Sequence, residues 1–427
     1  MPDDPEVSPS PPRGATPPAG TTKREPGAKP RLFFGWWVVA AIFVMLAVSS
    51  GLGFYNLSVV LQALTAERGF SVAAVSATTA LCFTVSGVAG LGVARLLDRW
   101  DPRVVVTLGA LIAAAGLLVI GRVETVPQLY LAYFVFGVGF AGTSLLPGTT
   151  LVTRWFSRRR GLAMALATTG LSAGGALITP LSARLIASRG IGGASPWLAG
   201  AYLVGILPLA VFLLRPRPER MGLHPDGASL PPAAGPPRAH GDVGSAIRSR
   251  FFLLVTASYT FAMAAQVGGI THHFKLVGDR AGAAVAATAV SMVAGGSICG
   301  RLAGGWMMSR VPLRPFSVVM LLIQGVMLAA LAIAPTASTL LLSSAGFGLT
   351  IGNVLLLQSM LMAEAFGTLL YARVYSIGNL LATAGLAGGP ILLGVLHDAS
   401  GYRLAFLGAM AASWVAALLM WIAGRDR

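Results

Sequence analysis

One arginine lies inside a long apolar stretch, where a permanent positive charge is costly to bury. Arg301 precedes Arg310, which should mark the end of the same helix, by nine residues. At 1.5 Å per residue the separation is about 13 Å, close to the middle of a hydrocarbon core. An arginine at that depth must face a helix bundle or a watery cavity. Because guanidinium binds carboxylates through two parallel hydrogen bonds, Arg301 could hold an organic anion.

Arg301 has no evident counter-ion in the sequence. All fifteen acidic residues fall in the tails, in loops or near helix ends. Asp398 is a conceivable partner, but it should lie near the outer surface, too far away. Two readings follow: the partner is an anionic ligand, or Arg301 is structural and is satisfied by backbone carbonyls, water or polar groups of the tenth helix.

Other polar side chains within apolar stretches could complete a binding cavity. Tyr375 and Asn379 are four residues apart, so they share one face of a helix. Asn353 and Tyr133 are further candidates for ligand contact. Each such residue could instead form hydrogen bonds between helices, since polar groups in lipid must find partners.

Two adjacent histidines, His272 and His273, should end the seventh helix near its outer mouth. Histidine titrates near neutral pH, so either could gate entry or take up a proton; an interfacial structural role is the alternative. Neighbours in sequence point in different directions, which argues against a shared metal. The two cysteines, Cys82 and Cys299, lie far apart in apolar stretches and indicate neither a disulfide nor a metal site.

Charged residues recur at equivalent loops. Asp98, Arg99 and Arg103 follow the second apolar stretch, and Arg310 and Arg314 follow the eighth. Arginines there can pair with helix C-termini or acidic neighbours in one of two conformational states. We interpret both sets as gating latches that affect turnover more than substrate choice.

The elements that position these residues are membrane-spanning helices. The chain is 55% hydrophobic and 11% charged, with a mean hydropathy of +0.75, whereas soluble domains carry about 25% charged residues. Such a chain needs lipid as its solvent. Its charge-free stretches predict an all-α membrane protein with twelve transmembrane helices and no strands; they are 32–66, 69–94, 104–121, 125–153, 161–183, 190–214, 251–271, 281–300 (extended to about 308), 315–363 (as two helices), 374–396 and 404–424.

The spans divide into two six-helix halves, 31–214 and 251–424, joined by a linker at 215–250 that is rich in Pro, Gly and Arg. Residues 1–30 should form a disordered cytoplasmic tail. With both termini in the cytoplasm, 23 basic residues fall on the cytoplasmic side and seven on the other, as the positive-inside rule requires. The net charge of +16 is thus a topology signal and does not indicate nucleic acid. The high Arg and Ala content suggests a bacterial inner membrane.

Internal repeats link the two halves. The glycine-rich run from Gly170 to Gly175 resembles the run from Gly385 to Gly389 in the corresponding helix, which is typical of transporters. Gly296, Gly300 and Gly304 recur every four residues, which predicts close approach of another helix beside Arg301.

The motifs of this sequence resemble those of the major facilitator superfamily. The loop with Asp98, Arg99 and Arg103 matches its general motif. The helix-one opening at 34–39 and the run at 154–165 before helix five are similar to the monocarboxylate porter and oxalate–formate antiporter group. Gly300-Arg301-Leu302 and Gly388-Gly389-Pro390 add to the likeness. The resemblance covers roughly 31–424 and implies the major facilitator fold, with Arg301 binding the substrate carboxylate.

Two departures from the group bear on substrate and coupling. Proton-linked relatives often carry an acid one turn before the arginine, where this chain has Ser297. Any coupled proton must then be carried by His272, His273 or the substrate. Oxalate exchangers have a second buried cation in helix eleven, but 374–396 contains no Lys or Arg. One cation suits one carboxylate, which favours lactate, pyruvate or formate.

We therefore expect a monomeric secondary carrier of small monocarboxylates, without cofactor or metal. An oxalate or dicarboxylate exchanger and a multidrug or sugar facilitator of the same fold are alternatives, and a non-transporting sensor is a further one. The sequence has no helical HExxH motif and no buried pair of carboxylates, which argues against an enzyme. It also lacks a phosphate-binding G-x-x-x-x-G-K-[ST] loop, so ATP should not drive the cycle.

Overall fold

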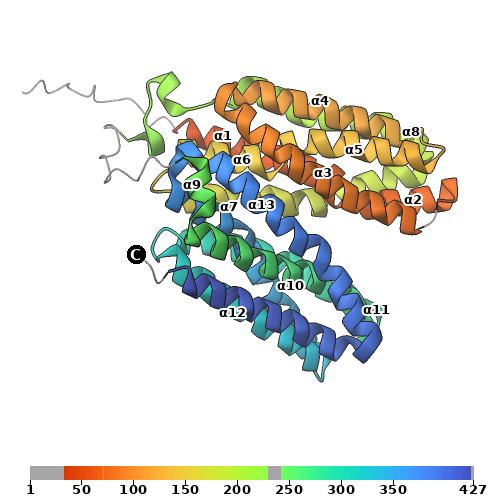
Figure 1. Ribbon diagram of the computed structural model, residues 1–427. Coiled ribbons are helices and arrows are strands. Elements are labelled where there is room, and N and C mark those ends of the chain that lie inside the picture. Colours follow the sequence, from red (N-terminus) through yellow and green to blue (C-terminus); the bar gives the residue numbers. More distant parts are fainter. Residues whose placement is uncertain (1–32, 71, 229–241, 425–427) are drawn as a thin grey trace, which may run out of the picture. The chain divides into compact units, whose positions relative to one another are not determined.

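The computed structural model describes residues 33–70, 72–228 and 242–424. The chain divides into Met1–Leu32 and Phe33–Arg427, and the predicted tail at 1–30 lies outside the described residues. Within the described ranges the chain is helical and contains no strand, as Figure 1 shows. The predicted all-α class is confirmed.

The N-terminal half and the linker hold the first elements in Figure 1. They are α1 (Gly35–Ser49), η1 (Ser50–Phe54), α2 (Asn56–Arg68), α3 (Val72–Arg99), α4 (Pro102–Ile120), α5 (Val126–Thr143), α6 (Leu145–Trp155), α7 (Arg160–Ala173), η2 (Gly174–Ile178), α8 (Thr179–Pro208), η3 (Leu209–Leu213), η4 (Pro218–Met221) and η5 (Pro225–Gly227). The remaining elements are α9 (Val243–Arg248), α10 (Arg250–Ala281), α11 (Ala283–Met307), α12 (Leu313–Ile333) and α13 (Ala337–Ile422).

Nine helical stretches of the described chain are long and apolar enough to cross a membrane. Three glycines interrupt two of them with left-handed backbone that other residues rarely adopt: Gly190 (φ 66°) in one, and Gly367 (φ 69°) and Gly401 (φ 76°) in the other. Division at these glycines gives twelve helical segments, the number that the charge-free stretches predict.

The seventh span is longer than expected. His272 and His273 were predicted to end it, but α10 continues to Ala281. Lys275 and Asp279, four residues apart, form an ion pair of 3.2 Å along the extension. Such a pair supports a helix even outside an apolar stretch, which is why counting charge-free residues ended the span too early.

The helix that carries Arg301 is packed very closely against the first part of α13. A Cβ atom on Gly296 or Gly300 would overlap the backbone of Ala345 or Leu349. The repeat of small residues on α11 therefore allows backbone-to-backbone contact, as predicted. This contact fixes where Arg301 lies relative to α13.

Two short π-helices, η1 and η2, interrupt the first and fifth spans and contact each other. Ser50 in η1 donates a hydrogen bond to the Leu171 carbonyl (2.9 Å), and Thr179 donates to the Gly51 carbonyl (2.9 Å). π-helical turns widen a helix locally and are frequent at functional sites. Here η2 begins two residues after Ser172, whose hydroxyl accepts a hydrogen bond from Arg301.

Candidate functional site

Arg301 is 4% exposed and reaches from the C-terminal half to the N-terminal half. Its Nη1 donates to the carbonyl oxygen of Thr168 (2.9 Å) and to the hydroxyl of Ser172 (2.9 Å), both on α7. Its Nε is buried without an acceptor. No carboxylate pairs with it in the described ranges, so the charge is solvated only in part and only by neutral groups.

Two more buried polar atoms without partners lie close to Arg301. Ser297 Oγ is one helical turn away on α11, and Asn353 Oδ1 is on the facing part of α13. Asn353 abuts Gly304, while Gly352 contacts the Cγ of Arg301. Buried polar atoms normally have partners, so these three orphans near one cation form a group of polar atoms that the described residues leave unsatisfied.

An aromatic side chain from the first span borders the same region. Tyr55 interacts electrostatically with Arg301. Its ring also lies against Gly175, where a Cβ would come within 2.8 Å of it. Gly175 is three residues beyond Ser172, on the same face of the fifth span. Residues from α11, α7 and the α1–α2 junction therefore surround the guanidinium.

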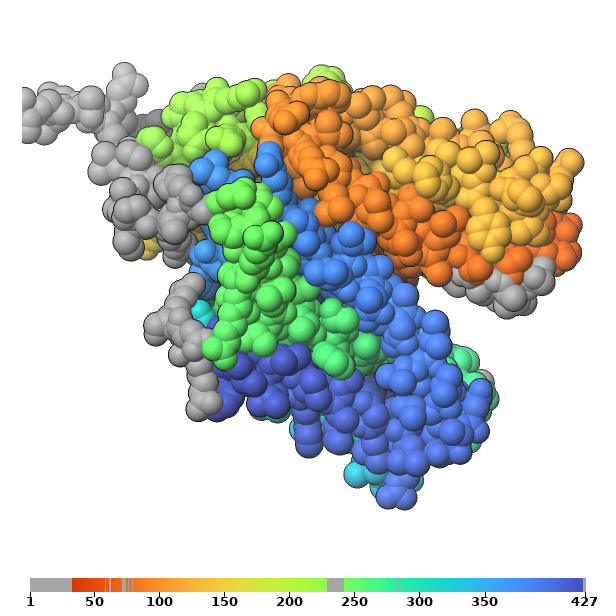
Figure 2. Space-filling model, in the orientation of Figure 1, coloured from red at the N-terminus to blue at the C-terminus, as the bar shows by residue number. Residues whose placement is uncertain are grey.

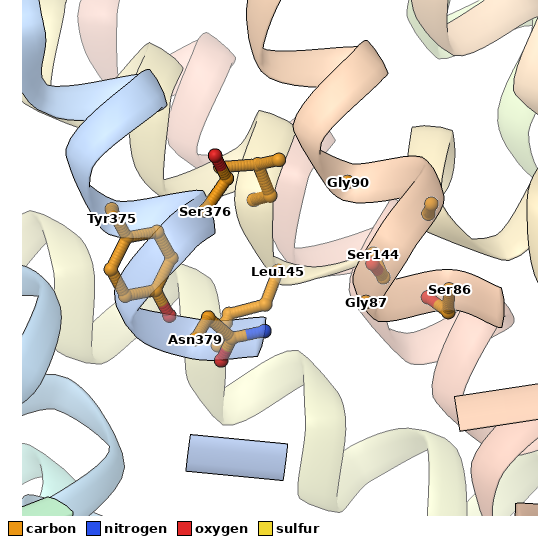
Figure 3. A pocket seen from close by; sticks show the side chains of 10 residues that line it. Ser86, Gly87, Gly90, Ser144, Leu145, Tyr375, Ser376 and Asn379 are labelled. Carbon is orange, nitrogen blue, oxygen red and sulfur yellow. The ribbon is translucent and has the colours of Figure 1, made fainter. Parts of the chain in front are cut away.

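Tyr375 and Asn379 line one cavity, as their spacing predicts. The cavity, of about 50 Å³, lies between α3, α5, α6 and the second part of α13. Figure 3 shows both side chains beside Leu145, with Ser86 and Ser144 across from them. Tyr375 is fully buried and stacks on Tyr371, with ring centroids 5.3 Å apart. Arg301 does not line this cavity.

The structure places the other two candidate ligand contacts apart from this cavity. Asn353 lies against α11, as described above, and its amide nitrogen donates to the Leu349 carbonyl (3.0 Å) in its own helix. Tyr133 is 1% exposed, and its hydroxyl bonds with Thr78, which places it between α3 and α5. Tyr133 therefore packs within the N-terminal half.

The two histidines face different partners, as expected for adjacent helical residues. His272 Nε2 lies 3.1 Å from the Pro390 carbonyl oxygen, and His273 Nε2 lies 2.8 Å from the Ser344 hydroxyl. His273 is buried and His272 is half-buried. Both therefore bridge α10 to α13.

The predicted latch residue Asp98 joins the two halves. Its Oδ2 is 2.6 Å from Arg373 Nε on α13, and its Oδ1 is 3.8 Å from Arg154 Nη2 on α6. Arg103 donates to the Leu214 carbonyl (2.8 Å) at the end of η3. In Figure 2 the orange and blue surfaces of α3 and α13 meet near α9, and the surface is hollowed between them farther along. We call the end with Asp98 and Arg373 the linker end.

The remaining latch residues have more local contacts. Arg310 stacks over Trp306 of the preceding turn, 3.7 Å from the ring centroid, and Arg314 lies over Phe251 at 5.2 Å. Arg99 lines a polar cavity of about 440 Å³ with Asp98, Arg154, Arg217 and other residues.

Sequence reasoning did not identify the partners of these residues. Thr168 contributes a backbone carbonyl, which has no side-chain signature, and Ser172 is an ordinary serine in a glycine-rich helix. Arg373 was counted only as a topology signal. The one available hint is a pair of glycines, Gly170 and Gly174, spaced four residues apart. Both face α1, which indicates that the fifth span packs tightly at this depth.

Comparisons with known proteins agree on the class of protein. The model of the Major Facilitator Superfamily matches residues 42–370. Monocarboxylate transporter 11 of Mus musculus is 29% identical over 88% of this chain and 84% of its own length. The oxalate:formate antiporter of Oxalobacter formigenes is 26% identical over 42% of each chain.

Solved structures show the same fold. A crystal structure of the fucose:proton symporter of E. coli superposes with a TM-score of 0.67 at 14% identity, covering 91% of this chain and 98% of that one. The human organic anion transporter MFSD10 gives a TM-score of 0.67 at 16% identity, covering 90% and 99%. At these identities the likeness concerns the fold alone.

Proposed function

Because the chain belongs to the Major Facilitator Superfamily, we propose that it is a secondary transporter of small monocarboxylates such as lactate, pyruvate or formate. It works by alternating access, with Arg301 as the anion-binding group. The similarity to a monocarboxylate transporter along most of both chains supports this substrate class. Transporters of this fold carry their substrate between the two halves, where Arg301 lies.

The single observation that carries the proposal is the incomplete solvation of Arg301. A buried arginine that served only packing would be expected to have its donors satisfied. Here Nε is an orphan, and so are Ser297 Oγ and Asn353 Oδ1 nearby. A carboxylate supplies a negative charge together with acceptors for the two donors among these atoms, Arg301 Nε and Ser297 Oγ, whereas neutral acceptors bring no charge.

Charge also supports one carboxylate over two. The second part of α13 has no basic residue from Val374 to Leu396. A second substrate carboxylate would thus remain without a cation at membrane depth. An oxalate exchanger is the second candidate, and the similarity to the oxalate:formate antiporter favours it.

The positive-inside pattern puts the linker end in the cytoplasm of a plasma membrane, with both termini on that side. The contact between Asp98 and Arg373 then closes the transporter toward the cytoplasm, and the observed conformation is one that exchanges substrate with the outside. A proton, if it is coupled, is carried by His272, by His273 or by the substrate, because Ser297 cannot carry it.

The test is uptake of labelled lactate into liposomes that contain the purified protein, with and without an inward proton gradient. The wild type should show saturable uptake, and Arg301→Ala should abolish it. Arg122→Ala is a matched control, because Arg122 is an exposed arginine just after α4 that donates to the Leu118 carbonyl of that helix. Lactate uptake unaffected by Arg301→Ala would refute the role of Arg301. If oxalate competes with labelled lactate better than pyruvate does, an oxalate exchanger would replace the monocarboxylate transporter as the proposed function.

A further inference from the structure

A carboxylate in the linker is bound to the N-terminal half by three backbone hydrogen bonds. Asp226 Oδ2 accepts from the amides of Ser157 (2.9 Å) and Arg158 (2.7 Å). Its Oδ1 accepts from the amide of Arg159 (3.1 Å). Almost seventy residues separate Asp226 from these partners. A carboxylate that accepts several backbone N–H groups is strongly held, because each bond is charge-assisted.

The backbone around Asp226 is shaped for this contact. Asp226 has φ 59°, the one positive φ at a non-glycine position in the described chain, and Gly227 follows with φ 70°. Phe33 lies directly over Gly227, where a Cβ would come within 2.9 Å of its ring. A left-handed aspartate is unusual and persists only where the surroundings hold it.

The amides that Asp226 binds lead directly into α7. Arg159 is the N-cap residue of this helix, and its own side chain makes no capping bond. An anion at a helix N-terminus satisfies free N–H groups and is favoured by the helix dipole. Asp226 therefore satisfies, from the linker, the N-cap amide of α7 and the two amides that precede it.

The start of α7 also contacts the C-terminal half at the linker end. Gly161 abuts Gly305 of α11, with its Cβ position 2.9 Å from the Gly305 carbonyl oxygen. Farther along the same two helices, Thr168 and Ser172 bind Arg301. The start of α7 and the Arg301 contacts are thus parts of one interface between α7 and α11.

We propose that Asp226 is a positioning residue for transport: it clasps the start of α7 and so stabilises closure of the linker end. Without the clasp, the start of α7 is free to shift, the Gly161–Gly305 contact loosens, and the linker end opens more often. The clasp acts on the conformational equilibrium and not on the substrate. It is therefore testable without any substrate, and its failure is distinct from a failure of the transport proposal.

Two variants distinguish the effect of the Asp226 carboxylate from the effect of its positive-φ backbone. Asp226→Gly keeps access to positive φ but removes all three bonds. Asp226→Asn tolerates the same backbone and keeps one acceptor oxygen, so its effect should be intermediate. Asp242→Asn is the matched control: Asp242 is an exposed linker carboxylate that precedes α9 without capping it.

The first measurement is hydrogen–deuterium exchange of the full-length protein in nanodiscs. In Asp226→Gly the amides of 157–159 should exchange about tenfold faster or more, since they lose their acceptors. The second uses spin labels on Val104→Cys and Val311→Cys, exposed positions in the first turn of α4 and after α11, in a background without Cys82 and Cys299. The distance distribution should shift to longer values in both Asp226 variants and stay unchanged in Asp242→Asn.

Unchanged exchange at 157–159 would show that the clasp does not exist in the membrane. Faster exchange with an unchanged distance distribution would show that the clasp only caps α7 and does not bear on closure, which would overturn the proposal. If Asp226→Gly does not fold, Asp226→Asn decides between the same outcomes.

Discussion

At Arg301 a full positive charge meets only neutral acceptors. Moving such an ion out of water costs several kcal/mol even after relaxation. Each hydrogen bond to a charged group returns roughly 1.5–3 kcal/mol, and among the described residues the acceptors lie at Nη1. The balance leaves a site that gains from an anion, which is the physical basis of the proposed substrate binding between the halves.

Ser172 should compete with the substrate for the guanidinium. Ser172→Ala removes one of the two acceptors of Nη1. The substrate carboxylate then has one hydrogen bond fewer to displace when it binds Arg301. We expect the KM for lactate to fall by up to about tenfold, the equivalent of about 1.4 kcal/mol. Uptake kinetics in liposomes would check this. An increase in KM would instead mean that Ser172 orients Arg301 for the substrate.

The sequence predicted Arg301 at membrane depth and the absence of an acidic partner, because charges in apolar stretches are conspicuous. It left open whether carbonyl groups satisfy the side chain. The structure agrees with each interpretation in part: the Thr168 carbonyl accepts a hydrogen bond from Arg301, and Nε remains without an acceptor. Which carbonyl meets an arginine more than a hundred residues away depends on packing, which no local pattern encodes.

At the scale of the elements, the glycines of α11 allow this helix to pack closely against α13. Gly300→Ala would place a methyl group onto the Leu349 backbone, whereas a Cβ on Gly295 of the same helix meets nothing within 4 Å. Overpacking costs typically about 1–3 kcal/mol, so Gly300→Ala should lower the thermal unfolding midpoint and impair uptake. Gly295→Ala is the control and should leave both unchanged. Equal midpoints for the two variants would contradict the close contact of α11 and α13.

The sequence predicted which helices form better than it predicted where they end. Apolar length alone predicted the spans, since lipid requires every backbone group to be bonded within a helix. Charge-free counting then ended α10 too early, because the pair of Lys275 and Asp279 continues the helix beyond the apolar stretch. The π-helices η1 and η2 have no sequence signal, because they arise from contact between two spans.

For the whole molecule, Asp98 and Arg373 should act as one unit that closes the linker end. Breaking a partly buried ion pair is costly, so we expect Asp98→Asn or Arg373→Gln to reduce the turnover of lactate by about tenfold with KM little changed. The double variant should be no worse than Asp98→Asn alone, since coupled residues are not additive. Initial uptake rates would measure this, and losses that simply multiply would mean that the two residues act independently.

At this scale the repeats and the loop motif predicted two halves and a latch at Asp98. The partner was not predicted, because Arg373 belongs to the other half and is 275 residues away in sequence. For residues 215–250 the sequence predicted only a linker rich in Pro, Gly and Arg. Its described part includes η4, η5 and α9, and Asp226 ties it to the start of α7. An isolated aspartate in a Pro- and Gly-rich stretch gives no sign of such a contact.

The measurement that tests the central claim most directly is calorimetric binding of lactate and of lactamide, its neutral isostere, to purified wild-type protein and to Arg301→Gln. If Arg301 holds the carboxylate, the wild type should bind lactate at least about tenfold more tightly than lactamide, a difference of about 1.4 kcal/mol or more. Arg301→Gln should lose that preference while keeping its thermal unfolding midpoint. Equal affinity for the acid and the amide in the wild type, or an intact preference in Arg301→Gln, would contradict the account.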